Sequence, residues 1–179
     1  MHRYILTGAP GAGKTVILRG LERRGYAVIG EAATDVIARR QARGHPEPWT
    51  SAGFIDRIIA LQRRRQQQAT GRLQIFDRSP VCTLALARFL GLEVSELLAR
   101  ELERIEREAI YERRAFLVEG LGFVARTAAR RIGLEDARRF GELHEAVYRE
   151  LGYELVRIGP ATPEARAEEV ARLIGAWRR

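Results

Sequence analysis

Short apolar runs alternate with longer amphipathic stretches along the whole chain. The apolar runs predict five strands, at residues 3–7, 26–29, 73–76, 115–118 and 153–158. Their residues do not alternate strictly between polar and apolar, as expected for strands that are covered on both faces. Regular alternation of strands with helices predicts an α/β fold of three layers, in which helices flank a five-stranded parallel sheet.

The amphipathic stretches predict helices at residues 14–24, 32–43, 52–70, 80–90, 95–113, 135–151 and 163–177. Glycine follows several of these stretches directly, as it does in helices that end on a left-handed residue. The segments 44–51 and 120–133 fit no regular pattern. Loops of this kind border the ligand cleft of a parallel sheet, so we expect both segments near a binding site.

The chain has the size of one ordinary domain. It contains 179 residues without an internal repeat or a linker, so we expect a single domain over residues 1–179. No apolar run approaches the roughly 20 residues of a membrane span, and the apolar run at the N-terminus is too short for a signal peptide. The single cysteine, Cys82, excludes an internal disulfide and a zinc site of several cysteines. We therefore expect a cytoplasmic protein with no membrane partner and a buried Cys82.

The chain carries a formal net charge of +8, which is typical of proteins that bind nucleic acids. Its arginines, however, alternate with glutamates, as in ELERIEREAIYERR at 101–114, and this pattern predicts solvated helix faces with ion pairs. We therefore expect no nucleic-acid partner. Lys14 is the only lysine among many arginines, and the compact, flexible charge of lysine suits a site crowded by phosphate oxygens.

The segment GAPGAGKT at residues 8–15 matches the phosphate-binding pattern G-x-x-x-x-G-K-[ST] at every fixed position. It follows a predicted strand and precedes a predicted helix, and this context argues against a plain glycine-rich turn. In such a loop the backbone amides bind phosphates, Lys14 reaches the terminal phosphates, and the Thr15 hydroxyl is a magnesium ligand. The predicted ATP-binding residues are Gly8, Ala9, Pro10, Gly11, Ala12, Gly13, Lys14, Thr15 and Val16.

An acidic residue closes the third predicted strand. Asp77 has the form of the strand-end acid that holds the magnesium shell in P-loop proteins. Arg78 follows it, where an ATPase machine would usually carry a water-activating glutamate, so the pair favours a phosphotransferase. The alternative is that Asp77 and Ser79 only cap the helix that begins at Pro80.

Glu31 follows the second predicted strand and should lie at the carboxyl edge of the sheet, near the P-loop. There a carboxylate can accept the proton of an acceptor hydroxyl or hold a magnesium-bound water. The same position suits an acidic residue that stabilises a helix N-terminus by about 0.3–1 kcal/mol. The pattern alone leaves both interpretations open.

Other candidates lie in the irregular segments. Segment 120–133 carries Arg126, Arg130 and Arg131, which predict a lid whose arginines neutralise a transferring phosphoryl group, although a solvated helix face fits them equally. From the expected fold alone, an adenine ring would rest against the loop that contains Pro160 and Thr162.

Two aromatic residues near segment 44–51 are further candidates. Trp49 and Phe54 can stack on a planar acceptor. The aliphatic residues that follow Phe54 at helical spacing favour a core position for it, whereas Trp49 stays open between the two roles. The three histidines lie far apart and lack the spacing of metal ligands.

Several segments together support a resemblance to a known family. They are GAPGAGKT, GYAVIGEAA around Glu31, F-x7-Q from Phe54 to Gln62, FDRSP around Asp77, and ELHEAVYRELGYELVRIGPATPEAR near the C-terminus. The chain resembles the small P-loop ATPase and kinase family that includes the kinase domain of ribosylnicotinamide kinase, and more distantly the deoxynucleoside kinases. The resemblance covers most of the chain and implies the sheet order 2-3-1-4-5. By this resemblance, the residues that face the acceptor or close over it are Glu31, Gln62, Asp77, Arg78 and either Arg126 or Arg131.

These observations predict a kinase that uses ATP and Mg²⁺ to phosphorylate a hydroxyl group of a small molecule, which is nucleoside-, vitamin- or antibiotic-like. The alternative is a regulatory ATPase that switches a protein or nucleic-acid partner. The chain contains no asparagine, which excludes the N-K-x-D motif of guanine-specific switches and the asparagine sensor of ATPase machines. Stimulation of ADP release by a metabolite would support the kinase, and stimulation by nucleic acid would support the switch.

Overall fold

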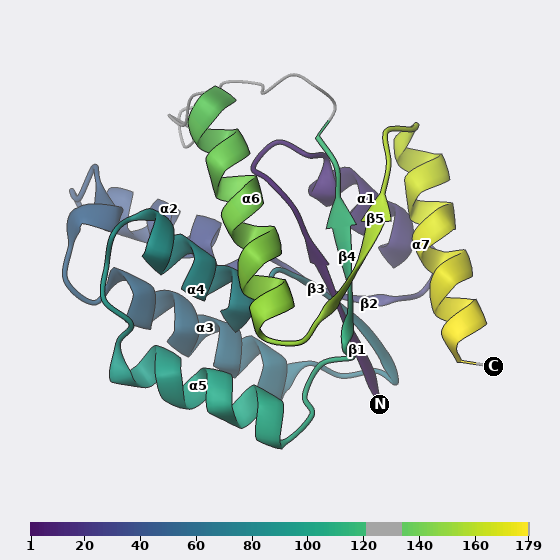
Figure 1. Cartoon of the computed structure of the whole chain (residues 1–179), viewed down its shortest axis with the longest axis horizontal. Helices are drawn as coiled ribbons and strands as arrows, with labels where there is room; N and C mark the ends of the chain where they lie inside the picture. The colour runs from purple at the N-terminus through teal and green to yellow at the C-terminus, as the bar shows by residue number, and fades with distance from the viewer. Residues whose placement is uncertain (121–133, 179) are drawn as a thin grey trace.

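The computed structural model describes residues 1–120 and 134–178. Its centre is a sheet of five parallel strands in the order β2-β3-β1-β4-β5, which confirms the predicted fold class and strand order (Figure 1). The strands are β1 (His2–Thr7), β2 (Ala27–Ile29), β3 (Leu73–Asp77), β4 (Arg114–Val118) and β5 (Glu154–Ile158). Because β1 is the central strand, the P-loop that follows it lies at the middle of the carboxyl edge.

Each predicted helix is present. The helices are α1 (Lys14–Glu22), α2 (Ala32–Gln41), α3 (Phe54–Gln68), α4 (Pro80–Phe89), α5 (Glu96–Arg107), α6 (Leu134–Glu150) and α7 (Pro163–Trp177). A short 3₁₀ helix, η1 (Pro48–Thr50), lies within the segment that we expected to be irregular, and proline occupies its first position.

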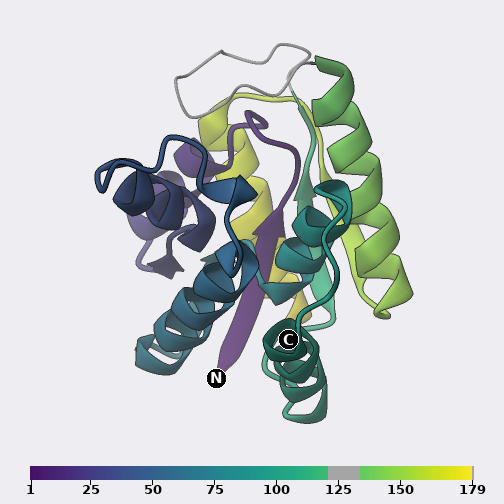
Figure 2. The ribbon, with the colours of Figure 1, turned by 90° about the vertical axis from the view of Figure 1, so that its left-hand side faces the viewer.

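The sheet separates two apolar cores because successive strand residues point to opposite faces. In β1, Tyr4 and Leu6 pack with α1 and α7, whereas Ile5 packs with the helices of the opposite face. Figures 1 and 2 show α1 and α7 on one side of the sheet and α3 to α6 on the other. This arrangement is the three-layer fold that the strand and helix pattern predicted.

The predicted helix at residues 95–113 is too long. Helix α5 ends at Arg107, and Ala109 adopts a left-handed φ of 45° that no helix continues through. The Glu112 amide then donates to the Arg3 carbonyl at 2.9 Å, so the chain already runs beside β1 before β4 begins. The charged residues after Arg107 favour a helix locally, but strand pairing overrides this preference.

Two expected core residues lie in the same apolar core. Cys82 is 3% exposed and Phe54 is 2% exposed, which confirms both expectations. Among the described residues, no helix combines the length and the apolar character that a membrane span requires.

Candidate active site

The P-loop connects β1 to α1 by a turn that only glycine can make. Gly8 has a φ of 138°, and a Cβ at this position would lie 2.4 Å from the Val118 carbonyl oxygen. Gly13 precedes α1 with a φ of 89° and has no side chain to cap the helix. The first amides of α1 are therefore oriented as in helix N-termini that bind phosphate.

Lys14 spans the loop. Its Nζ donates to the carbonyl oxygens of Gly8 and Ala9, both at 3.1 Å. Burial, with the Arg78 cation as a second cause, lowers the pKa of Lys14 to about 8. Phosphate oxygens in the loop would oppose both effects, so this lysine fits a polyanionic ligand.

Arg166, which the sequence analysis did not identify as a site residue, forms hydrogen bonds to the backbone of the P-loop and of its neighbours. Arg166 is 2% exposed and donates to three carbonyl oxygens, those of Ala12 at 3.0 Å, Glu119 at 2.6 Å and Ile158 at 3.2 Å. It thereby joins the P-loop to the ends of β4 and β5. In a chain so rich in arginine, no local pattern distinguishes this residue.

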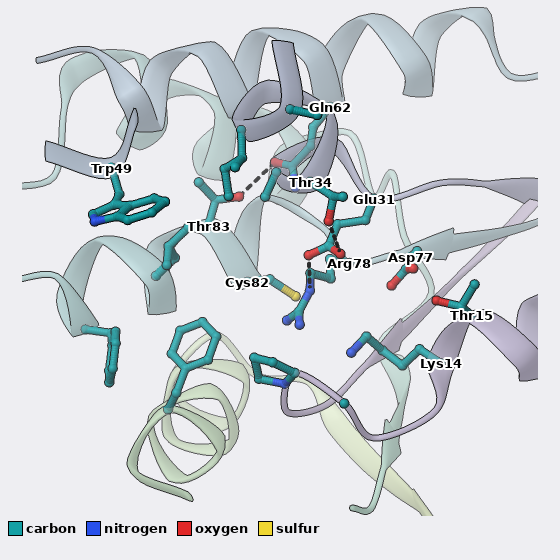
Figure 3. A pocket seen from close by; sticks show the side chains of 18 of the residues that line it. Lys14, Thr15, Glu31, Thr34, Trp49, Gln62, Asp77, Arg78, Cys82 and Thr83 are labelled. Carbon is teal, nitrogen blue, oxygen red and sulfur yellow. Dashed lines mark hydrogen bonds and ion pairs between the residues drawn. The ribbon is translucent and has the colours of Figure 1, made fainter. Parts of the chain in front are cut away.

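Asp77 and Thr15 lie on the same side of the P-loop. Asp77 is 8% exposed, and β3 pairs with β1 so that Asp77 lies beside Leu6. Figure 3 shows the Asp77 carboxylate and the Thr15 hydroxyl facing each other next to Lys14. Carboxylate and hydroxyl oxygens are donors that Mg²⁺ prefers, so these two residues fit the predicted magnesium site.

The capping interpretation finds no support at Ser79. This residue precedes α4, but its side chain makes no capping hydrogen bond. Its hydroxyl lies 2.9 Å from the Tyr148 hydroxyl instead. Ser79 therefore connects α4 to α6 through a buried polar contact.

Glu31 and Arg78 form an ion pair beside the P-loop (Figure 3). The Glu31 Oε1 lies 2.6 Å from the Arg78 Nε, and its Oε2 accepts a hydrogen bond from the Thr34 hydroxyl at 2.9 Å. Burial raises the pKa of Glu31, but the Arg78 and Lys14 cations outweigh burial, so the pKa lies below its ordinary value. Although Glu31 precedes α2, its side chain does not cap this helix.

His144 holds the other side of the Arg78 guanidinium. The His144 Nδ1 lies 2.9 Å from the Phe140 carbonyl, which can only accept, so Nδ1 carries the proton. The unprotonated Nε2 then accepts from the Arg78 Nη1 at 3.0 Å. Burial lowers the pKa of His144 to about 3, with the Arg78 cation as a second cause, and the ring is neutral near pH 7. The backbone of Arg78 has a left-handed φ of 69°, which is uncommon for a residue other than glycine.

A cavity of about 700 Å³ is lined by the P-loop and by this ion pair, and it extends from them away from the P-loop. At its far end the Thr83 hydroxyl donates to the Gln62 Oε1 at 3.0 Å, and Trp49 faces the same space (Figure 3). Most other side chains at this end are apolar: Ala33, Ile37, Ala38, Phe54, Leu86, Phe89, Leu90 and Phe140. The volume lies within the range of pockets for small organic ligands.

The structure brings together most of the predicted site residues. The cavity is lined by Pro10, Gly11, Gly13, Lys14, Thr15, Val16, Glu31, Trp49, Gln62, Asp77 and Arg78. The other P-loop residues, Gly8, Ala9 and Ala12, shape the loop without lining the cavity. Pro160 and Thr162 lie outside this cavity, and the Thr162 hydroxyl caps α7 by accepting from the Ala165 amide at 3.2 Å. Arg126 and Arg131, with the predicted lid, lie outside the described residues.

Comparison with known proteins identifies the family of the chain. A family model described as an AAA domain matches residues 3–166. The chain belongs to this AAA domain family. No curated protein shows a significant match.

The fold of this AAA domain is shared with solved kinase structures. Shikimate kinase from Acinetobacter baumannii, in complex with shikimate, aligns with a TM-score of 0.64 at 16% identity, over 98% of this chain and 94% of that chain. Deoxyadenosine kinase from M. mycoides, with the products dCMP and a flexible dCDP bound, aligns with a TM-score of 0.64 at 14% identity, over 97% and 99% of the two chains. At these identities the likeness shows a common fold, that of P-loop kinases. The resemblance to ribosylnicotinamide kinase stays a prediction.

Proposed function

We propose that this AAA domain protein is a kinase that transfers a phosphoryl group from ATP to a hydroxyl group of a small molecule. The P-loop supports ATP as the donor because its glycines, Lys14 and the N-terminus of α1 form a phosphate cradle. Members of the same fold named as kinases of shikimate and deoxyadenosine support a small-molecule acceptor.

Each residue of the site has a role in this proposal. Lys14 binds the terminal phosphates, and Thr15 and Asp77 hold a magnesium ion, which neutralises charge on the phosphates. Glu31 accepts the hydrogen bond, and then the proton, of the acceptor hydroxyl. Arg78 holds the acceptor or the transferred group. We further assign acceptor contacts to Trp49 and Gln62, lid functions to Arg126 or Arg131, and adenine contacts to Pro160 and Thr162.

The reaction is an in-line displacement. The acceptor oxygen forms a bond to the γ-phosphorus, the bond from this phosphorus to the β,γ-bridging oxygen breaks, and ADP leaves with the electron pair. The acceptor proton passes to Glu31. A low pKa makes Glu31 a weak base, but phosphoryl transfer needs only modest help with this proton.

The position of the Glu31–Arg78 pair is the main support for the proposal. The pair lies between the P-loop and the apolar end of the cavity, where an acceptor hydroxyl would meet the terminal phosphate. A regulatory ATPase needs a site for water there, but no apolar space for an organic molecule. The volume and lining of the cavity therefore favour a kinase.

Acceptor-dependent turnover tests the function. We would measure ADP release from Mg-ATP with a library of small alcohols and identify a product by the mass of one added phosphoryl group. Glu31→Gln should lower acceptor phosphorylation by at least about 100-fold and still bind Mg-ATP, because it removes both the proton acceptor and the charge that holds Arg78 in place. Glu22→Gln, an exposed change on α1, is the matched control and should leave turnover unchanged.

One result would overturn the kinase, and another would overturn only the role of Glu31. The first is ADP release that no alcohol stimulates but a nucleic acid does. The second is full activity of Glu31→Gln, which would return Glu31 to a structural role. The proposal includes a cytoplasmic location, with which the single, buried Cys82 agrees.

A further inference from the structure

A second cavity lies between α2 and α3, away from the P-loop. Its volume is about 290 Å³. Its apolar floor is formed by Val36, Ala60 and Leu61. The other lining residues are all arginines: Arg39, Arg40, Arg43, Arg57 and Arg64. Helices α2 and α3 pack against each other here.

The positive charges around this cavity are not compensated by ion pairs. Among the described residues, none of its five arginines forms an ion pair, and residues 121–133 contain no acidic side chain. By contrast, Arg104 on α5 pairs with Glu101 at 2.8 Å, and Arg88 on α4 pairs with Glu150 at 2.5 Å. The cavity is thus a local excess of positive charge.

Helix dipoles explain only part of this cluster. Arg39 and Arg40 lie in the last turn of α2, where cations are favourable. Arg57 lies near the N-terminus of α3, where a cation opposes the dipole. The Arg40 Nε is buried and has no hydrogen-bond partner among the described residues, so an acceptor there would satisfy it.

We propose that the α2–α3 cavity is a binding site for a small molecule with two or more phosphoryl groups. Guanidinium groups bind phosphate oxygens through paired, charge-assisted hydrogen bonds. The apolar floor formed by Val36 and Leu61 strengthens these bonds by excluding water on one side. A nucleic-acid strand would need a basic groove that follows several phosphates, whereas this cavity has room for one small ligand.

The site shares a helix with the candidate active site. Ile37 and Gln41 of α2 line the large cavity, whereas Val36 and Arg40 of the same helix line the α2–α3 cavity. A ligand that bridges α2 and α3 would therefore stabilise a helix that borders the active site. The binding site itself does not depend on the proposed kinase function.

NMR titration tests the site with inorganic pyrophosphate as the probe. In magnesium-free buffer at about 0.15 M salt, the amide signals of residues 36–43 and 57–64 should shift and saturate with their own Kd, separate from that of residues 8–15. The double variant Arg40→Gln/Arg43→Gln should weaken the first Kd by about tenfold or more and leave the P-loop response intact. An intact P-loop response also shows that the variant is folded.

A control variant that removes the same number of positive charges elsewhere distinguishes a specific site from general electrostatic attraction of the anion. Arg23→Gln/Arg172→Gln removes two exposed arginines, one directly after α1 and one in α7, and should change the Kd less than about twofold. The proposal fails if residues 36–43 show no saturable shift, or if the control variant weakens binding as much as Arg40→Gln/Arg43→Gln. It also fails if a single-stranded oligonucleotide binds these residues more tightly than pyrophosphate, because the surface would then serve nucleic acid.

Discussion

Lys14 and Arg78 bring two positive charges into a buried site, and their different partners have opposite effects on their pKa values. Burial lowers the pKa of both groups. The Glu31 carboxylate, 2.6 Å from Arg78, outweighs burial and raises the pKa of Arg78, which stays protonated at every accessible pH. Lys14 donates to two carbonyl groups, and its pKa falls to about 8.

The lowered pKa of Lys14 predicts that ATP binding weakens in alkaline solution. Phosphates raise the pKa of Lys14 in the complex, so the complex favours the protonated form. Affinity should be constant below pH 8 and fall above it, by up to about tenfold per pH unit. Calorimetric Kd values from about pH 7 to 9.5 measure this slope. Lys14→Met should bind more weakly without the slope, and an equally flat profile for the wild type would contradict the prediction.

His144 predicts a loss of stability in mild acid. The unfolded chain binds a proton at this residue near pH 6.5, whereas the folded chain resists protonation down to about 3. The unfolded state therefore binds more protons within this window, and the free energy of unfolding falls as the pH decreases. Between pH 7.5 and 5.5 the wild type should lose about 1.4 kcal/mol more than His144→Gln, measured by urea denaturation. Parallel curves for the two proteins would rule out a neutral, buried His144.

At the scale of elements, α1 and α7 approach each other closely at one glycine. A Cβ at Gly20 of α1 would lie 2.8 Å from the Ala167 Cβ of α7. The absence of a side chain at Gly20 therefore sets the distance between the helix that carries the P-loop and the helix that carries Arg166. Arg166 of α7 in turn donates a hydrogen bond to the Ala12 carbonyl of the P-loop at 3.0 Å.

Substitution at Gly20 tests this contact. Alanine favours a helix by about 1 kcal/mol over glycine, but Gly20→Ala should lower stability by about 1–3 kcal/mol because the helices must separate. Gly175→Ala in α7 is the matched control, since nothing lies within 4 Å of its added Cβ, and it should stabilise the protein slightly. Urea denaturation compares the two. A stabilising Gly20→Ala would show that α1 and α7 adjust to the added methyl group without cost.

At the scale of the whole molecule, the structure redistributes the charge of the chain. Many exposed arginines pair with glutamates, for example Arg107 with Glu108 and Arg113 with Glu106 within segment 101–114, as the interleaved sequence predicted. The α2–α3 cavity departs from this pattern, because two helices bring together arginines from separate segments and none of these arginines forms an ion pair among the described residues. Alternation along a sequence therefore does not ensure that charges alternate over a surface.

This distribution predicts weak binding of duplex DNA. With most of the described arginines paired or scattered, few phosphates can be neutralised together, so affinity should fall steeply with salt and be slight at about 0.15 M. DNA should not stimulate ATP turnover. Fluorescence anisotropy with a labelled duplex, followed over a salt series, measures the affinity. Tight binding at physiological salt, accompanied by faster ADP release, would favour the regulatory ATPase.

The sequence by itself determined the fold class, the strand order that the family resemblance implied, and the P-loop. These features depend on local patterns: apolar runs, amphipathic stretches, and a motif whose residues are adjacent in the chain. Strand ends meet at one edge of a parallel sheet, so the positions of Glu31 and Asp77 near the P-loop also followed from the pattern.

Only the tertiary structure decided how side chains from distant segments combine. In the folded chain His144 contacts Arg78, and Arg166 forms a hydrogen bond to the P-loop. The arginines of α2 and α3 gather around one cavity. Helix packing sets these contacts, and packing depends on the complementary shapes of whole elements, which no spacing within a single segment encodes.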